Sequence, residues 1–345
     1  MKLEASYDLA PRFQSSGLSA ASLLLSPVEP FVYRFADLKP ALYPPESSST
    51  DLFILGQNLD RASLSLHTAP VDITVGRQAI AWGSARSVNP TDILAPFTFG
   101  TLDTEDRIGV DAVRARIPLG TLSEIDTGYV FGKDFLFQNS AAYGRIKAHA
   151  CRTDMAFLLM GFRRNLMFGF DLARAIRGAG FWIESAYVLA RATESNAADD
   201  RRAYLRVSSG ADYSFTDKTY GFLEYHFNGA GKALPGEYPD ALAEPAYLEG
   251  SVYLLGRHYL ISGMHYRISG LLTVMAQSMM NLTDRSLLLA PQMEYNLVRN
   301  IYLGAGAFFG FGGNRERAES GGPVPLRTEF GGYPNICFGS IRYYF

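Results

Sequence analysis

The sequence lacks any uninterrupted apolar run long enough to cross a membrane as a helix, which takes about 20 residues. Helical membrane spans are therefore excluded. The chain also lacks a surplus of either charge, because its formal net charge is −2. Without a basic surplus, nothing suggests electrostatic capture of nucleic acid, and we expect no nucleic-acid partner.

Cysteine and metal-ligand patterns are sparse as well. Only Cys151 and Cys337 are present, and they fall in predicted strands that lie far apart in sequence. The chain has no C-x-x-C pair and no Cys/His cluster, so we expect no metal site and no obligatory cofactor. We interpret both cysteines as small apolar side chains that face lipid or packed neighbours, with a disulfide as the alternative.

Catalytic motifs are missing too. The sequence has no G-x-S-x-G elbow, no H-E-x-x-H and no G-x-x-x-x-G-K-[ST] loop. The stretch around Gly304, Gly306 and Gly310 lacks the spacing of a dinucleotide fingerprint and fits a strand whose glycines face inward. His226, two residues after Glu224, is the best candidate base, but such a pair is commonplace in a strand. We therefore predict no catalytic residues and no enzyme.

Alternation of apolar and polar residues is what the sequence does have. Residues 203–215 set one apolar face against one polar face, with Leu205, Val207, Ala211, Tyr213 and Phe215 alternating with Tyr204, Arg206, Ser208 and Asp212. Residues 70–80, 122–132 and 286–297 show the same period of two, which is typical of a strand with unlike faces. Such strands explain a mean hydropathy of zero in a chain that is 48% hydrophobic, because only alternate residues of a barrel strand face lipid.

The spacing of these segments predicts an all-β fold, a transmembrane antiparallel β-barrel of about sixteen strands. We place the strands near residues 3–13, 57–68, 70–81, 107–118, 122–132, 142–151, 154–164, 166–177, 180–191, 203–215, 219–228, 258–268, 271–282, 286–297, 300–312 and 333–345. Connections after even-numbered strands are short, whereas most of the others are long. Short periplasmic turns and long outer loops explain this parity. Fourteen or eighteen strands are the alternatives, because strand boundaries are the least reliable part of such a prediction.

A soluble β-sandwich or a set of blades is the competing fold. Against it, the chain shows no internal repeat at a fixed period of about 20–50 residues. A soluble fold also leaves the many aromatic-rich apolar faces unexplained. We therefore treat residues 1–345 as one barrel domain.

The last residues strengthen this prediction. Ile341, Tyr343 and Phe345 alternate with Ser340 and Arg342. A strand that ends in Phe resembles the signal that outer-membrane barrels present to the barrel assembly machinery. The resemblance implies that Tyr343 and Phe345 act as an assembly signal, that the machinery is a partner, and that the chain lies in the lipid bilayer of the Gram-negative cell outer membrane.

Export to the outer membrane requires a signal peptide. The N-terminus, from Met1 to Asp8, has no apolar stretch of the kind that such a signal contains. We therefore expect that the signal has been removed and that Met1 does not belong to the exported chain.

A barrel of this size leaves a lumen. The faces that we assign inward carry charges of both signs, and the predicted pore-lining residues are Arg114, Arg116, Glu124, Asp126, Arg145, Lys147, Glu184, Arg206, Asp212, Glu224 and Glu294. One interpretation is that cross-strand ion pairs stiffen the wall. The other is a transverse field that orients a dipolar solute at a constriction.

Two long loops, 14–56 and 82–106, are expected to fold into the lumen or over its mouth. The first contains Phe31, Tyr33 and Phe35 and is too apolar to hang in water. The alternative for these three aromatics is that they extend a strand above the membrane.

The second loop follows a strand with a distinctive sequence. Gly76-Arg77-Gln78 is followed by Trp82-Gly83, by Asn89-Pro90-Thr91-Asp92 and by Pro96-Phe97. This block resembles a GRQ…WG…NPTD…P segment of several poorly characterised families of bacterial outer-membrane porin-like barrels. Gly83 allows a tight backbone approach, and the Asn-Pro-Thr-Asp stretch forms a turn or cap. We predict a latch made by Arg77, Trp82, Asn89 and Asp92, in which Arg77 reaches Asp92 or a loop carbonyl. Solute binding by this block is the alternative.

We therefore expect a porin or channel for passive diffusion of small solutes. One alternative is a more specific channel for hydrophobic or organic nutrients, suggested by loop aromatics such as Trp82 and Phe97. Another is a barrel that acts as a scaffold or sheath for a threaded protein partner. Trimers are common among sixteen-strand porins, so a homo-oligomer is a further expectation by analogy.

Overall fold

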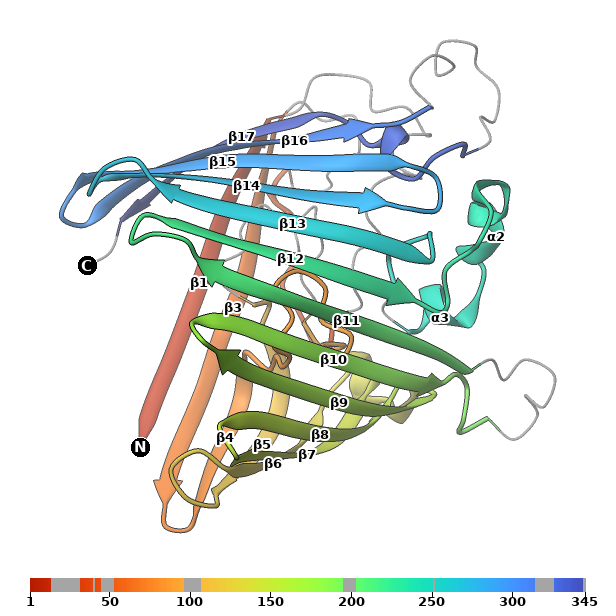
Figure 1. The fold of residues 1–345 in the computed structure, drawn as a ribbon. Helices are drawn as coiled ribbons and strands as arrows, with labels where there is room; N and C mark the ends of the chain where they lie inside the picture. The colour runs from red at the N-terminus through yellow and green to blue at the C-terminus, as the bar shows by residue number, and fades with distance from the viewer. Residues whose placement is uncertain are drawn as a thin grey trace.

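The computed structural model describes residues 1–13, 32–39, 41–44, 53–95, 107–194, 203–250, 252–313 and 326–343. These residues form a 17-stranded sheet, and every pairing between its strands is antiparallel. The sheet curls into a barrel (Figure 1). Within the described part of the chain, no helix is both long and apolar enough to cross a membrane.

All sixteen predicted strands are present in the positions expected, which confirms the predicted fold. Their bounds are β1 Lys2–Phe13, β3 Phe53–Thr68, β4 Val71–Gln78, β5 Val110–Pro118, β6 Glu124–Val130, β7 Ala141–Ala150, β8 Thr153–Phe162, β9 Asn165–Ile176, β10 Ala179–Leu189, β11 Ala203–Ser214, β12 Thr219–Asn228, β13 His258–Arg267, β14 Leu272–Asn281, β15 Ser286–Val298, β16 Ile301–Phe311 and β17 Ile336–Tyr343. The seventeenth strand is the short β2, Ala41–Tyr43, which the sequence did not predict because three residues carry no measurable alternation.

The strands pair as a meander. β1 pairs with β3 along its whole length, and β2 pairs with the first residues of β3. From β3 onward, each strand pairs with the next one in the chain as far as β17. The register shifts only between Ser6 and Tyr7 and between Asn296 and Val298 in these long pairings. Neighbours in sequence are thus neighbours in the sheet, and the order along the chain fixes which side chains meet across strands.

Turns and loops separate to opposite ends of the barrel. The short turns β7–β8 and β9–β10, together with the chain termini, lie at one end, whereas the segment with the short helices lies at the other (Figure 1). Cys151 and Arg152 form the β7–β8 turn with φ of 52° and 59°, which is the backbone of a two-residue hairpin turn that follows strand twist. The expected parity of short and long connections therefore holds, with tight exceptions at 163–164 and 282–285.

Helices are confined to the connections. The loop between β12 and β13 holds η3 Pro235–Glu237, α2 Tyr238–Ala241 and α3 Pro245–Leu248. Elsewhere in the described part of the chain, the short helical turns are η1 Lys133–Phe135, η2 Phe137–Asn139 and η5 Phe330–Gly332. None of these elements is long enough to show a helical period in the sequence, which is why sequence analysis places only loops there.

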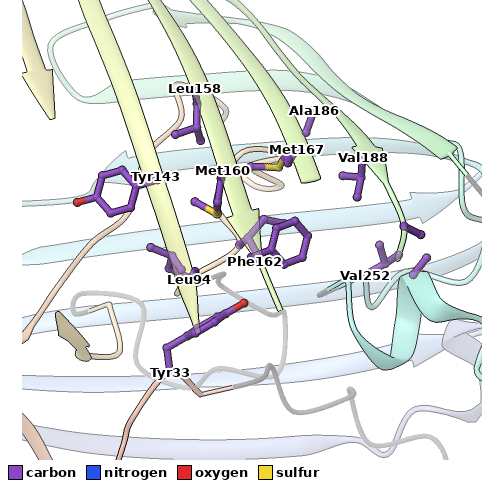
Figure 2. Close-up of a cluster of buried hydrophobic side chains, with 14 of the residues drawn as sticks. Tyr33, Leu94, Tyr143, Leu158, Met160, Phe162, Met167, Ala186, Val188 and Val252 are labelled. Atoms are coloured by element: carbon purple, nitrogen blue, oxygen red, sulfur yellow. The ribbon is translucent and has the colours of Figure 1, made fainter. Parts of the chain in front are cut away.

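The two faces of the wall differ as predicted. In β10, Phe181, Ile183 and Tyr187 are exposed, whereas Trp182 and Glu184 between them are buried. Since alternate residues of a strand point to opposite faces, the exposed aromatics share the outer face and the buried carboxylate faces inward. The inner face is covered by chain at the loop end, where Tyr33, Leu94, Met160, Phe162 and Val252 pack together (Figure 2).

Candidate functional site

Residues 80–95, which follow β4, lie against the inner face of the wall, and we call them the inserted segment. Their partners come from β6, β9, β10, β11, β12 and β14, far away in sequence. The segment leaves the sheet just after Gln78 and turns at Gly83, whose φ is +113°. Only glycine adopts that backbone without strain.

Glu184 of β10 is the main anchor of the inserted segment. Its side chain is fully buried, and its two carboxylate oxygens accept four hydrogen bonds. Oε1 accepts from the backbone N–H and the hydroxyl of Thr91 at 2.9 and 2.6 Å. Oε2 accepts from the N–H of Ala85 at 3.1 Å and from Nδ2 of Asn89 at 3.0 Å. One carboxylate thus satisfies buried donors at both ends of the turn.

Glu224 of β12 is a second anchor of the same kind. Its oxygens accept from the N–H groups of Arg86 and Val88 at 2.7 and 3.0 Å, and from Nε1 of Trp182 at 3.1 Å. The side chain of Arg86 continues along the wall. It pairs with Asp212 of β11 at 2.5 Å, and its guanidinium lies over the Trp182 ring, 5.2 Å from the centroid. Arg86 therefore combines an ion pair with a cation–π contact.

Trp82 fixes the start of the inserted segment. Its Nε1 donates to Oδ2 of Asp126 on β6 at 3.2 Å, and its ring meets the Tyr143 ring edge-on at 4.6 Å. Asp126 also receives a bidentate pair from Arg114 on β5 at 2.9 and 2.7 Å. The buried carboxylate is thus neutralised by a neighbouring strand while it holds the indole.

The end of the inserted segment is anchored by arginines. Arg206 of β11 donates to the carbonyl of Pro90 at 2.5 Å, and Arg107 pairs with Asp92 at 2.6 Å. Burial nevertheless raises the pKa of the Asp92 carboxyl to about 6, because loss of water outweighs the attraction of Arg107. Gly169 of β9 leaves room for Thr91. A Cβ added at Gly169 would lie only 2.9 Å from the Thr91 methyl group.

A buried serine and histidine lie beneath the same segment. The Ser208 hydroxyl donates to the carbonyl of Val88 at 2.5 Å and lies 2.8 Å from Nδ1 of His226. Glu224, which the sequence placed beside His226, is used by the backbone of the segment instead. Both Ser208 and His226 are covered, so their geometry serves to hold the segment.

Arg77 has other partners than Asp92. It makes a bidentate pair with Asp111 of β5 at 2.8 and 3.0 Å and contacts Asp37 at 3.0 Å. It also donates to the carbonyl of Ala36 at 2.7 Å. Arg77 therefore ties the first loop, not the inserted segment, to the wall. In that loop Tyr33 is buried, whereas Phe35 stacks on Phe135 at 4.7 Å. Phe31, Pro96, Phe97 and Phe345 lie outside the described residues.

The predicted pore-lining residues all belong to the inner face, but they differ in exposure. Asp126, Glu184, Arg206 and Glu224 are buried under the inserted segment. Arg145 lies 3.5 Å from Glu124, and Arg342 pairs with Glu294 at 2.5 Å. Arg116 and Lys147 are half-buried and form no ion pair with any described residue. Cross-strand ion pairs therefore account for much of the charge. Tyr343, predicted as part of the assembly signal, pairs with Ile301 at the end of β17.

A second polar cluster, at the loop end, was not predicted from the sequence. Glu329 accepts from the N–H of Leu255 at 2.9 Å, from the Tyr259 hydroxyl at 2.5 Å and from Nδ2 of Asn281 at 2.7 Å. Its own N–H donates to Asp284 at 2.6 Å. Burial raises the pKa of Glu329 to about 7. The cluster joins three connections, and no local pattern marks residues that meet only after the barrel has formed.

Comparison with known proteins supports the fold. No family model and no curated protein matches the chain. Among solved structures, the chain is similar to one described as "Asymmetric conductivity of engineered proteins", with a TM-score of 0.50 and 10% identity, covering 87% of this chain and 94% of that one. It is also similar to OccAB4 of Acinetobacter baumannii (TM-score 0.49, 9% identity, 76% and 72% covered) and to a mutant of Rh. blastica porin (TM-score 0.48, 10% identity, 87% and 94% covered). At 10% identity the likeness to the first of these structures concerns the fold alone.

Proposed function

We propose that this chain is an outer-membrane channel for passive diffusion of small solutes, narrowed by the inserted segment. The observation that carries the proposal is a segment held by buried carboxylates against the inner wall of a barrel. A channel needs an apolar outer face, a lined interior and a fixed narrow point, and each has a counterpart in the described residues.

The apolar outer face supports a bilayer setting. Exposed residues such as Phe157, Phe168, Tyr187, Leu205 and Leu223 alternate with inward partners along β8 to β12. Such a belt is costly in water and favourable in lipid. We place the barrel in the outer membrane, delivered by the barrel assembly machinery.

Two features suit a permanent opening beside the inserted segment. β16 turns Gly304 and Gly306 to the inner face, so it projects no side chain of its own there, and the Phe338 ring of β17 lies over Gly306. The carboxylates that anchor the segment lie on β6 to β12, and its contact with Gln277 brings it as far as β14, two strands from β16. Solutes would pass between the segment and β16.

Single-channel conductance of the purified protein in a planar bilayer tests the proposal. The comparison variant replaces residues 84–91 by an equal number of glycines and serines, which keeps the chain length but removes the anchored contacts. We expect stable ohmic steps from the natural sequence and larger steps from the variant. A folded barrel that stays silent in both forms contradicts the channel and favours a sheath around a partner, which co-purification would then reveal.

A further inference from the structure

The inner wall has two different halves. On β5 to β7 the inward positions include several charged side chains, with Arg114, Arg116, Asp126, Arg145 and Lys147 among them. On β13 to β17 the inward positions carry fewer charges, and apolar side chains stand there among polar ones such as Gln277 and Gln292; the apolar ones include Ile261, Met275, Met279, Leu288, Ala290, Phe308 and Phe338. Barrel interiors are ordinarily polar, and contact with lipid explains apolar residues only on the outer face. Lipid therefore does not explain an apolar strip on the inner face of several adjacent strands.

Two aromatic rings lie flat on the wall here, Phe338 of the strip and Phe222 of the adjacent β12. A Cβ added at Gly306 would be 2.5 Å from the Phe338 ring, and one added at Gly263 would be 2.1 Å from the Phe222 ring. Each ring thus occupies the space that a side chain on the neighbouring strand would fill. Phe338 also stacks on Phe308, with centroids 5.7 Å apart. Phe222 and Phe338 remain half-buried, so part of each ring is open toward the interior.

The strip adjoins the inserted segment. Val88 of the segment packs in one cluster with Leu254, Tyr259, Met279 and Leu288. Beside them, Gln277 of β14 donates to the Ser87 hydroxyl at 2.9 Å. The narrow point and the apolar strip are therefore neighbours, and a solute that passes the segment meets the strip.

Met275 and Gln292 mark the edge of the strip. They face each other across β14 and β15, both point inward, and both are half-buried. Gln292 lies near the place where a Gly306 side chain would stand, with its Cγ 3.0 Å from the added Cβ. The pair offers an apolar and a polar side chain of similar length at the same height of the channel.

We propose that the channel favours small amphipathic organic solutes, whose apolar body contacts the half-buried side chains of Phe222, Met275 and Phe338 while their polar groups face the charged half of the wall. The proposal rests on the channel function above. Contact between apolar surfaces removes both from water, and a polar sugar of similar size gains nothing from the strip.

Proteoliposome swelling with a phenyl hexoside and with a disaccharide tests this preference. Swelling of protein-free liposomes is subtracted, because the phenyl compound also crosses lipid. We expect the phenyl hexoside to enter about threefold faster or more. Met275→Gln and Phe338→Gln should lower the ratio of the phenyl hexoside rate to the disaccharide rate. Gln292→Met should raise this ratio. The exchange of both residues, Met275→Gln with Gln292→Met, is the matched control for composition and should restore most of the ratio.

Salt conductance separates this proposal from the channel function. All variants should conduct salt as the natural sequence does, which also shows that they are folded. A ratio near one, or a ratio that none of the substitutions moves while conductance persists, overturns the amphipathic preference and leaves the channel intact. If the natural sequence does not conduct, the channel itself fails, and the preference with it.

Discussion

At the scale of single residues, the inserted segment depends on carboxylates that accept hydrogen bonds from backbone N–H groups. Glu184 and Glu224 together bind the N–H groups of Ala85, Arg86, Val88 and Thr91. A loop has no paired strand whose carbonyl groups accept its hydrogen bonds, so its buried backbone N–H groups need acceptors from elsewhere. A carboxylate is well suited because it accepts at two oxygens and donates nothing.

Glu184→Gln should therefore release the segment in part. The amide keeps one acceptor oxygen but turns an NH₂ group toward donors, which leaves buried groups unpaired. We expect a loss of about 3 kcal/mol in the free energy of unfolding, together with noisier single-channel currents. Glu294→Gln is the control, because Glu294 pairs with Arg342 away from the segment. Equal effects of the two substitutions would argue against a special role for Glu184.

Gly83 offers a second test, with a matched control in the same chain. A Cβ at Gly83 would lie 2.4 Å from Nδ2 of Asn89 and 2.5 Å from a Glu184 oxygen. Gly120 has a similar φ, +127° against +113°, but nothing within 4 Å of its added Cβ. Both Gly→Ala variants suffer backbone strain of about 1–2 kcal/mol, and only Gly83→Ala should also alter conductance. Thermal unfolding and bilayer recordings measure the two effects, and an unchanged conductance in Gly83→Ala would show that the turn tolerates displacement.

Asp92 predicts a pH dependence of stability. Its pKa is raised to about 6 in the folded protein, so the folded state binds more protons than the unfolded state between about pH 4 and 6. Stability should therefore fall as the pH rises through this window, by about 3 kcal/mol from this group. Denaturant unfolding of the natural sequence and of Asp92→Asn at several pH values isolates the effect. Parallel pH profiles would contradict it.

At the scale of elements, strands were predictable and loops were not. Period-two alternation is local, so the bounds of β11 and β12 could be found from a few adjacent residues. The loop 82–106, which contains most of the inserted segment, was expected to fold into the lumen or over its mouth, and its GRQ…WG…NPTD block to form a latch. Its partners could not be assigned: Arg77 was expected to reach Asp92 or a loop carbonyl, and it binds Asp111 and the carbonyl of Ala36 in the first loop. Which carboxylate meets which donor depends on curvature and register of strands up to 138 residues away.

The hairpin turns allow a prediction about sidedness. Cys151 is exposed in the β7–β8 turn at the end that holds both termini, whereas Cys337 is exposed on β17 with its side chain on the face opposite to Phe338. In a bilayer, a membrane-impermeant maleimide should label Cys151 only from the short-turn side. Cys337 should stay unlabelled because its face meets lipid. Cys337→Ala is the control, and rapid labelling of Cys337 in the Cys151→Ala variant would place that face in water.

At the scale of the whole molecule, the long pairings make one continuous wall and the loops fill part of it. The wall follows from a repeated local pattern. The strands of both halves show this same alternation in the sequence, although the inner surfaces that they form differ. β13 and β14 carry apolar residues on both faces, and only their register with β12 and β15 shows which ones point inward. A prediction from sequence alone therefore yields a barrel with a lumen, but not the character of that lumen.

The position of the inserted segment along the chain has a consequence for how the molecule assembles. The segment follows β4, yet every carboxylate that anchors it belongs to a strand that comes later, from β6 to β12. The segment cannot dock until those strands have curved around it, since its acceptors do not exist as a surface before then. Contacts of such long sequence separation form slowly. Formation of the wall and docking of the inserted segment are thus separate events in time. A barrel that has closed before the segment docks would still migrate in a gel as a folded protein, but its lumen would remain wide open.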